Sequence, residues 1–167
     1  MISRKLIVLA LLTSLFIPVA AQRKAAGENV TWGLRAGWTV APLEWGGTAM
    51  KLSYTLGVAS DVRISRLPIS IETGLYYTNR YVSRYDNWSL LLPVLFRYEI
   101  RQGSGLSVQP FAGPFVAYSL DDQDWDVGLR LGVGFAKRHF YGNIGYDLSG
   151  NYGVDEDAFF ITVGYNF

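Results

Sequence analysis

The last ten residues, 158–167, read AFFITVGYNF and place an apolar side chain at every second position. Phe159, Ile161, Val163, Tyr165 and Phe167 share one face, and Phe160 is the only bulky residue on the other. A period of two is typical of a half-buried β-strand. Because a lone strand is not stable, this pattern predicts partner strands elsewhere in the chain.

The same alternation recurs in seven upstream segments. They are residues 30–40, 51–64, 69–80, 89–101, 106–120, 126–136 and 140–149. With the last segment they predict eight strands of about ten to fifteen residues each, long enough for the roughly 9–11 residues that cross a bilayer at a tilt. We therefore expect an all-β fold, an eight-stranded antiparallel up-and-down transmembrane β-barrel.

The placement of charge supports this interpretation. The eight segments contain twelve charged residues, and all twelve lie on the face opposite the apolar one. With an even chance for each charge, this arrangement would arise about once in four thousand sequences. A charge on a lipid-facing surface costs about 2–4 kcal/mol at the middle of the bilayer, which gives a physical reason for the pattern.

The connections alternate between long and short. The long ones are predicted at residues 41–50, 81–88, 121–125 and 150–157, and the short ones at 65–68, 102–105 and 137–139. Outer-membrane barrels have this pattern, with short turns on the periplasmic side. Pro93, Pro110 and Pro114 lie inside predicted strands and lack the N–H of a ladder bond, so we expect bulges or strand ends there.

Alternation alone does not tell which face points outward. A secreted, soluble lipocalin-like barrel that carries an apolar ligand has the same pattern turned inside out. Aromatic residues near the strand ends, a polar face rich in glycine and poor in lysine, and the absence of a helix after the last strand favour the membrane barrel.

The N-terminus predicts export. Arg4 and Lys5 precede an apolar run that is too short to span a bilayer and that ends at a small-residue cleavage site. We expect a signal peptide at residues 1–21, a periplasmic N-terminal segment at 22–29 and the barrel domain at 30–167, integral to the cell outer membrane. No cysteine is present, which excludes disulfides and a lipid-bearing cysteine.

Several strands resemble the PorT-like family of small outer-membrane β-barrel proteins. The matching stretches are IETGLYY (71–77), LLPVLFRYEI (91–100), QPFAGPFVAY (109–118) and GLRLGVGF (128–135), together with Phe167. The resemblance implies the barrel fold, and its motifs specify strands rather than chemistry. The family's named member is associated with protein secretion and surface export, so the resemblance also implies a role as an accessory to these processes.

The sequence offers little for catalysis. Serine or aspartate in outer-membrane hydrolases acts with a histidine, and the single histidine, His139, lies in a predicted tight turn. We expect no enzyme activity and no cofactor, and the near-balance of acidic and basic residues gives no reason to expect nucleic acid as a partner.

The inward charges predict an ionic network that fills the narrow bore of an eight-stranded barrel. Its members are Arg35, Asp61, Arg63, Glu72, Arg97, Glu99, Arg130 and Asp147. A narrow proton or ion path along the same residues is the alternative.

Two further sites are predicted at the ends of the barrel. Clustered carboxylates in two outward loops are either ordinary solvated charge or a binding site. The site would hold a divalent cation at Asp122, Asp124, Asp155 and Asp157, or else a protein partner. The last strand ends in an aromatic residue and resembles the closing strand of bacterial outer-membrane β-barrels, which the barrel-assembly machinery recognises during insertion. The resemblance implies an assembly signal at Phe159, Ile161, Val163, Tyr165 and Phe167. Outer-membrane lipid is then the constant partner of the folded chain.

Overall fold

The computed structural model describes residues 30–42, 50–64, 67–82, 85–102, 105–121, 123–150 and 157–167. The signal peptide predicted at residues 1–21 and the segment 22–29 lie outside this part of the chain. Within it, no helix is long and apolar enough to cross a membrane.

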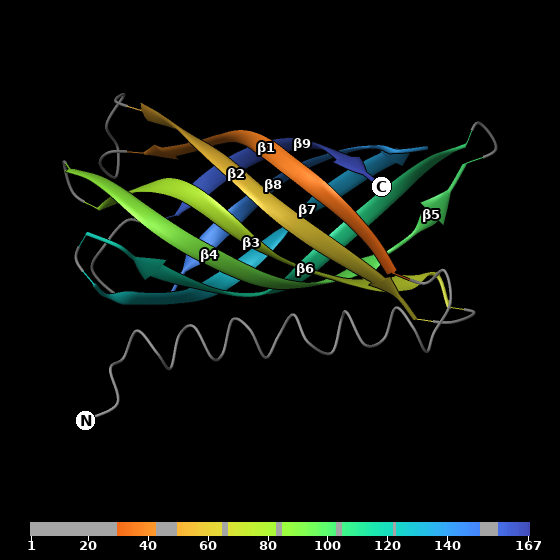
Figure 1. The fold of residues 1–167 in the computed structure, drawn as a ribbon, viewed down its shortest axis with the longest axis horizontal. Helices are drawn as coiled ribbons and strands as arrows, with labels where there is room; N and C mark the ends of the chain where they lie inside the picture. The colour runs from red at the N-terminus through yellow and green to blue at the C-terminus, as the bar shows by residue number, and fades with distance from the viewer. Residues whose placement is uncertain are drawn as a thin grey trace.

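All regular elements of the described chain are β-strands (Figure 1). Their bounds are β1 Val30–Pro42, β2 Met50–Arg63, β3 Ile69–Val82, β4 Tyr85–Tyr98, β5 Ile100–Arg101, β6 Leu106–Ser119, β7 Trp125–Lys137, β8 Phe140–Ser149 and β9 Ala158–Asn166.

The strands form one closed antiparallel barrel. Each strand pairs with its neighbour in sequence, and β1 pairs with β9, which joins the two ends of the chain (Figure 1). β4 and β5 are two parts of one strand, because both pair with β6 and the register is the same on either side of Glu99. The barrel therefore has eight strands, and the fold predicted from the sequence is confirmed. Closure leaves no unpaired edge.

The barrel has two distinct ends. β2, β5 and β7 finish, and β3, β6 and β8 begin, at the end where β1 begins and β9 finishes, which we call the turn end. β1, β3, β6 and β8 finish, and β2, β4, β7 and β9 begin, at the opposite end, which we call the loop end. In outer-membrane barrels the turn end faces the periplasm.

The apolar face of the strands points outward. The exposed side chains include Leu34, Trp38, Leu52, Tyr54, Leu56, Val58, Phe96, Tyr98, Val127, Leu129, Leu131, Phe135, Ile144, Phe159, Ile161, Val163 and Tyr165. The buried, inward side chains include Arg35, Thr39, Ser53, Thr55, Ser70, Glu72, Thr78, Arg97, Gln109, Arg130, Asn143, Asp147 and Thr162. A lipocalin-like carrier needs the opposite arrangement, so that alternative is wrong.

The prediction of a loop at residues 81–88 is also wrong. β3 extends to Val82 and β4 begins at Tyr85, with these two residues paired, so only residues 83–84 connect the strands. The physical reason is the composition of this stretch, in which tyrosine, valine and tryptophan favour strands and no glycine or proline marks a turn. The long and short connections therefore do not alternate throughout.

The prolines interrupt the ladders without making bulges. The pairing of β4 with β6 stops between Pro93 and Phe96 and resumes in the same register, and a similar gap separates Thr73 from Tyr76 on β3. No residue is inserted, so the expected bulges are absent from these described strands. The hydroxyl of Thr73 donates to the Pro93 carbonyl over 3.0 Å, which satisfies one backbone group beside the gap.

Candidate functional site

The lumen brings the predicted charged residues together in two groups. In the first group, Glu72 on β3 receives two arginines from different strands. Its Oε1 lies 2.6 Å from Arg97 Nη2 of β4, and its Oε2 lies 3.3 Å from Arg35 Nη2 of β1. All three side chains are buried. Since β1 and β4 are separated by two strands, Glu72 ties opposite parts of the wall together.

A second carboxylate continues this group toward the turn end. Asp61 Oδ2 on β2 lies 3.5 Å from Arg97 Nη1 and accepts a hydrogen bond from the Ser70 hydroxyl over 3.2 Å. Gln109 Oε1 accepts from the same Arg97 nitrogen at 3.5 Å. Arg97 is therefore the hub, with partners on three other strands.

Two tyrosines complete the first group, and no sequence pattern singled out either of them. The Tyr141 ring on β8 lies between two guanidinium groups, 4.4 Å from Arg35 Cζ and 4.6 Å from Arg97 Cζ. Tyr76 donates its hydroxyl hydrogen to Glu72 Oε1 over 3.4 Å. Cation–π contacts of this kind are favourable when water is excluded.

The second group is the pair of Arg130 on β7 and Asp147 on β8. Arg130 Nε and Nη2 donate to the two carboxylate oxygens over 2.6 and 2.7 Å, a bidentate geometry. The Arg130 guanidinium also lies 4.3 Å from the Phe160 ring centroid. Phe160 is the bulky inward residue of the closing strand, and its ring packs against this guanidinium inside the bore.

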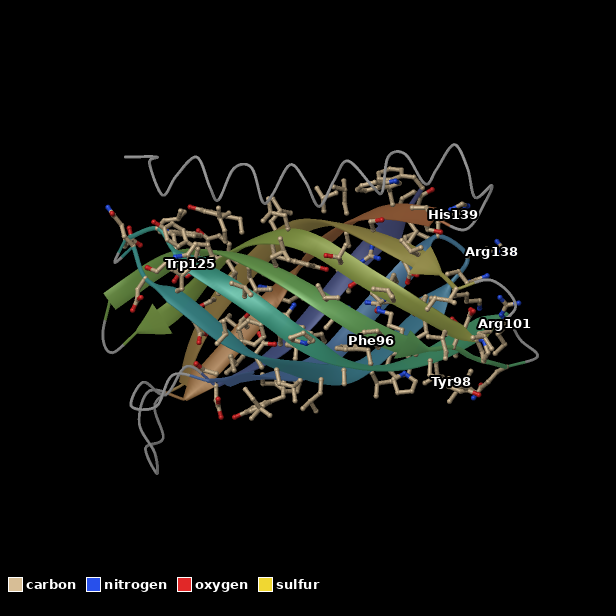
Figure 2. The ribbon with its side chains drawn as sticks, turned by 90° about the horizontal axis from the view of Figure 1, so that it is seen from below. Phe96, Tyr98, Arg101, Trp125, Arg138 and His139 are labelled. Carbon is tan, nitrogen blue, oxygen red and sulfur yellow. The ribbon has the colours of Figure 1, made fainter. Side chains whose placement is uncertain are left out.

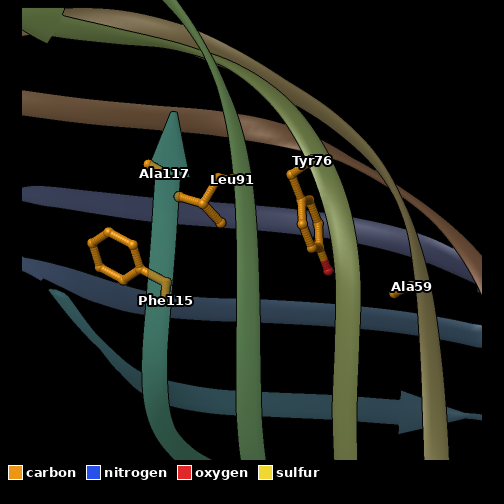
Figure 3. Close-up of a cluster of buried hydrophobic side chains, with 5 residues drawn as sticks. All are labelled: Ala59, Tyr76, Leu91, Phe115 and Ala117. Carbon is orange, nitrogen blue, oxygen red and sulfur yellow. The ribbon is translucent and has the colours of Figure 1, made fainter. Parts of the chain in front are cut away.

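Apolar side chains fill the remaining cross-section. One buried cluster consists of Ala59, Tyr76, Leu91, Phe115 and Ala117, which project from β2, β3, β4 and β6 (Figure 3). Another consists of Leu95, Phe111 and Phe160. These residues occupy inward positions that the charge pattern did not identify, because they are apolar in a face that is otherwise polar.

The turn end contains a cavity of about 430 Å³. Arg63 and Arg101 line it and share one oxygen, Glu99 Oε2, at 3.1 and 3.2 Å. Arg97 and Tyr141 also belong to the lining, so the cavity reaches down to the first ionic group. The predicted residues Arg63 and Glu99 therefore lie in this vestibule rather than deep in the bore.

His139 lies on the rim of the same end, with Arg138 beside it (Figure 2). Its Nδ1 is 3.0 Å from the Asn166 carbonyl, and its ring stacks on Tyr165 at 5.4 Å between centroids. Through these contacts His139 helps to hold the start of β8 against the end of β9.

Two of the predicted loop-end carboxylates lie in the described part of the chain, and both accept hydrogen bonds from backbone N–H groups. Asp124 Oδ1 accepts from Trp125 N over 2.8 Å, and Asp157 Oδ1 accepts from Ser149 N over 2.9 Å. Asp122 and Asp155 lie outside the described residues. Within the described part of the chain, no group of three histidine, cysteine or acidic residues could hold a metal ion.

Aromatic side chains cluster at both ends of the outer surface. At the loop end Trp88 stacks on Tyr77 at 4.7 Å and meets Tyr54 at 5.2 Å, and Trp125 contacts Tyr118 at 4.8 Å. At the turn end Tyr165 contacts Phe140 and Phe167 at 5.7 and 5.6 Å. Figure 2 shows Trp125 at the end opposite His139. Amphipathic rings at these levels match the two interfaces of a bilayer.

The comparisons with known proteins agree with this architecture. A model of the outer membrane protein beta-barrel domain matches residues 7–167. No curated protein matches the chain. Two solved structures, Neisserial surface protein A and the N-terminal β-barrel domain of OprF from Pseudomonas aeruginosa, superpose with TM-scores of 0.56 and 0.55. Their identities are 13% and 16%, and the matches cover 84% and 83% of this chain and 98% of each of theirs. At these identities the likeness shows the fold.

Proposed function

The chain belongs to the outer membrane protein beta-barrel domain family, and from this premise we propose that it is a closed, non-catalytic barrel that acts through contacts at its two ends. It is an integral protein of the cell outer membrane, where its apolar outer surface contacts lipid. The proposed role is structural or interactive, with the lumen plugged by paired charges.

The observation that carries this proposal is the filled bore. Arg35, Glu72 and Arg97 form an ionic group between opposite parts of the wall, and Arg130 and Asp147 form another. The two apolar clusters occupy the space around them. An eight-stranded barrel has an interior just wide enough for side chains, so little room is left for a stream of water or ions.

The same contacts favour a non-catalytic role. The His139 ring contacts the Asn166 carbonyl and the Tyr165 ring, and the inward carboxylates Glu72 and Asp147 are held by arginines. A general base needs a proton to abstract from a neighbouring nucleophile. We propose that these groups maintain the shape of the barrel instead.

Finer assignments rest on the sequence resemblance. We propose that the chain is PorT-like and an accessory to protein secretion or surface export, with a protein partner at the loop end and the barrel-assembly machinery as a partner during insertion. Copurification from native membranes after crosslinking tests this role. A secretion component among the crosslinked proteins supports it, and recovery of lipid alone contradicts it.

The experiment for the closed lumen is conductance in planar bilayers. The folded wild type is expected to give no steady channel. The double change Glu72→Ala and Arg97→Ala removes both partners at the hub and is expected to raise conductance. The matched change in the vestibule, Glu99→Ala with Arg101→Ala, is expected to leave it unchanged. A steady channel from the wild type would contradict the plugged lumen.

A further inference from the structure

The turn-end cavity is lined by more positive than negative side chains. Four arginine side chains contribute to its wall, Arg63, Arg97, Arg101 and Arg138, against two acidic side chains, Asp61 and Glu99, and the last residue, Phe167, also lines the cavity. The four arginines belong to β2, β4, β5 and the β7–β8 turn, so positive charge lines the cavity from several elements of the barrel. Asp61, Arg97 and Tyr141 belong to the first ionic group and form the floor of the cavity, whereas Arg63, Arg101 and Arg138 lie outside the two groups that fill the bore.

Both carboxylates of the wall are already engaged. Asp61 is held by Arg97 and by the Ser70 hydroxyl. Glu99 is shared between Arg63 and Arg101 through a single oxygen. One carboxylate for two guanidinium groups leaves donor N–H groups unused, because each guanidinium carries five of them.

Arg138 adds a further cation, and the described residues supply no counterion for it. In the described part of the chain it forms no ion pair, and its side chain is exposed beside His139 (Figure 2). Its backbone has a φ of 56° in the two-residue turn between β7 and β8. A non-glycine residue rarely adopts this left-handed conformation, so the turn holds Arg138 at the mouth at some cost in backbone energy.

From this geometry we infer that the turn-end cavity is a binding site for a phosphate group. Guanidinium forks match phosphate oxygens through paired N–H···O bonds, and a tetrahedral anion can accept such bonds from several sides at once. A volume of about 430 Å³ has room for a phosphate with the atoms attached to it.

Two sources can supply this group at the turn end. The aromatic cluster of Tyr165, Phe140 and Phe167 is typical of side chains at a bilayer interface, so we expect anionic lipid headgroups next to the cavity mouth. Free phosphate in the periplasm has the same chemistry. The site does not depend on whether the lumen conducts.

The test uses the full barrel in zwitterionic micelles and follows thermal stability against inorganic phosphate, with chloride at matched ionic strength. Phosphate is expected to stabilise the wild type in a saturable manner. The change Arg138→Gln is expected to weaken the apparent affinity about tenfold, as the loss of one charge-assisted interaction would.

Lys137→Gln is the matched control. It removes the same charge from the adjacent residue, which is exposed and is absent from the cavity lining. It is expected to leave the phosphate response intact. An equal loss in Lys137→Gln and Arg138→Gln, or a wild type that responds no more to phosphate than to chloride, would overturn the site.

Nanodiscs distinguish the two sources. If lipid supplies the group, phosphatidylglycerol raises stability relative to phosphatidylcholine, and Arg138→Gln abolishes the increment while Lys137→Gln retains it. If the free anion is the ligand, phosphate stabilises the barrel in phosphatidylcholine discs and phosphatidylglycerol adds nothing. No response in any of these conditions would contradict the proposal.

Discussion

Arg130 and Asp147 lie directly opposite each other on β7 and β8, and their side chains meet through two parallel hydrogen bonds of 2.6 and 2.7 Å inside the barrel. The register of the two strands therefore sets the geometry of the pair. Both side chains are buried, so each depends on the other for solvation.

Removing one partner of this pair is expected to be costly. Arg130→Ala leaves Asp147 buried without a partner, and we expect a loss of about 3–5 kcal/mol in the free energy of unfolding, measured in urea with the barrel in lipid vesicles. Arg101→Ala is the control, because its pair with Glu99 is exposed and is worth about 0–1 kcal/mol. If Arg130→Ala combined with Asp147→Ala costs as much as both single changes added, the two residues do not interact.

A glycine at the interrupted ladder gives a second prediction. A Cβ on Gly113 would collide with the Val94 carbonyl oxygen of the neighbouring strand. Gly113→Ala is therefore expected to destabilise the barrel by about 1–3 kcal/mol in the same assay. Gly142→Ala is the matched control, because its nearest atom would be Thr162 O at 3.6 Å. Equal stabilities for the two variants would show that β4 and β6 are not so close at this point.

The closing strand is predicted to direct assembly. Phe167 is exposed at the turn end, and its N–H donates to the Trp32 carbonyl over 2.8 Å, which helps β9 close against β1. Deleting Phe167 is expected to reduce the inserted, heat-modifiable fraction in membranes. Phe140→Ala, which removes an equally exposed ring at the same end, is expected to reduce it much less. Equal insertion of both variants and the wild type would argue against a terminal signal.

The cation site at the loop end stays a prediction. We expect millimolar calcium to raise the thermal stability of the wild type, and the fourfold change of Asp122, Asp124, Asp155 and Asp157 to asparagine to abolish the gain. Asparagine keeps an oxygen for the backbone N–H groups that Asp124 and Asp157 accept from, so the fold should survive. Equal shifts in both proteins would mean that the carboxylates bind no ion.

The sequence predicted the faces of the strands because burying charge in lipid has a large cost. That cost acts on each position separately, so it leaves a pattern that can be read without a structure. The point where β3 ends and β4 begins left no such pattern, since Val82 and Tyr85 are ordinary strand residues.

The contacts inside the bore could be predicted only in part. Arg130 and Asp147 are on adjacent strands, so counting from the turn between them suggests their pairing. Tyr141 was missed because its two arginines come from β1 and β4, across the lumen. A contact of that kind depends on the tilt and closure of the whole barrel, which no local pattern encodes.

The most direct test of the account asks what surrounds the apolar face. The chain has no cysteine, so single cysteines can carry a nitroxide spin label at Leu131, Val163 and Asp124 without interference. In lipid vesicles, the labels at exposed Leu131 and Val163 are expected to collide with oxygen dissolved in lipid and not with a water-soluble nickel complex, while the label at Asp124 collides with nickel. High nickel accessibility at Leu131 and Val163 would contradict a barrel embedded in the membrane.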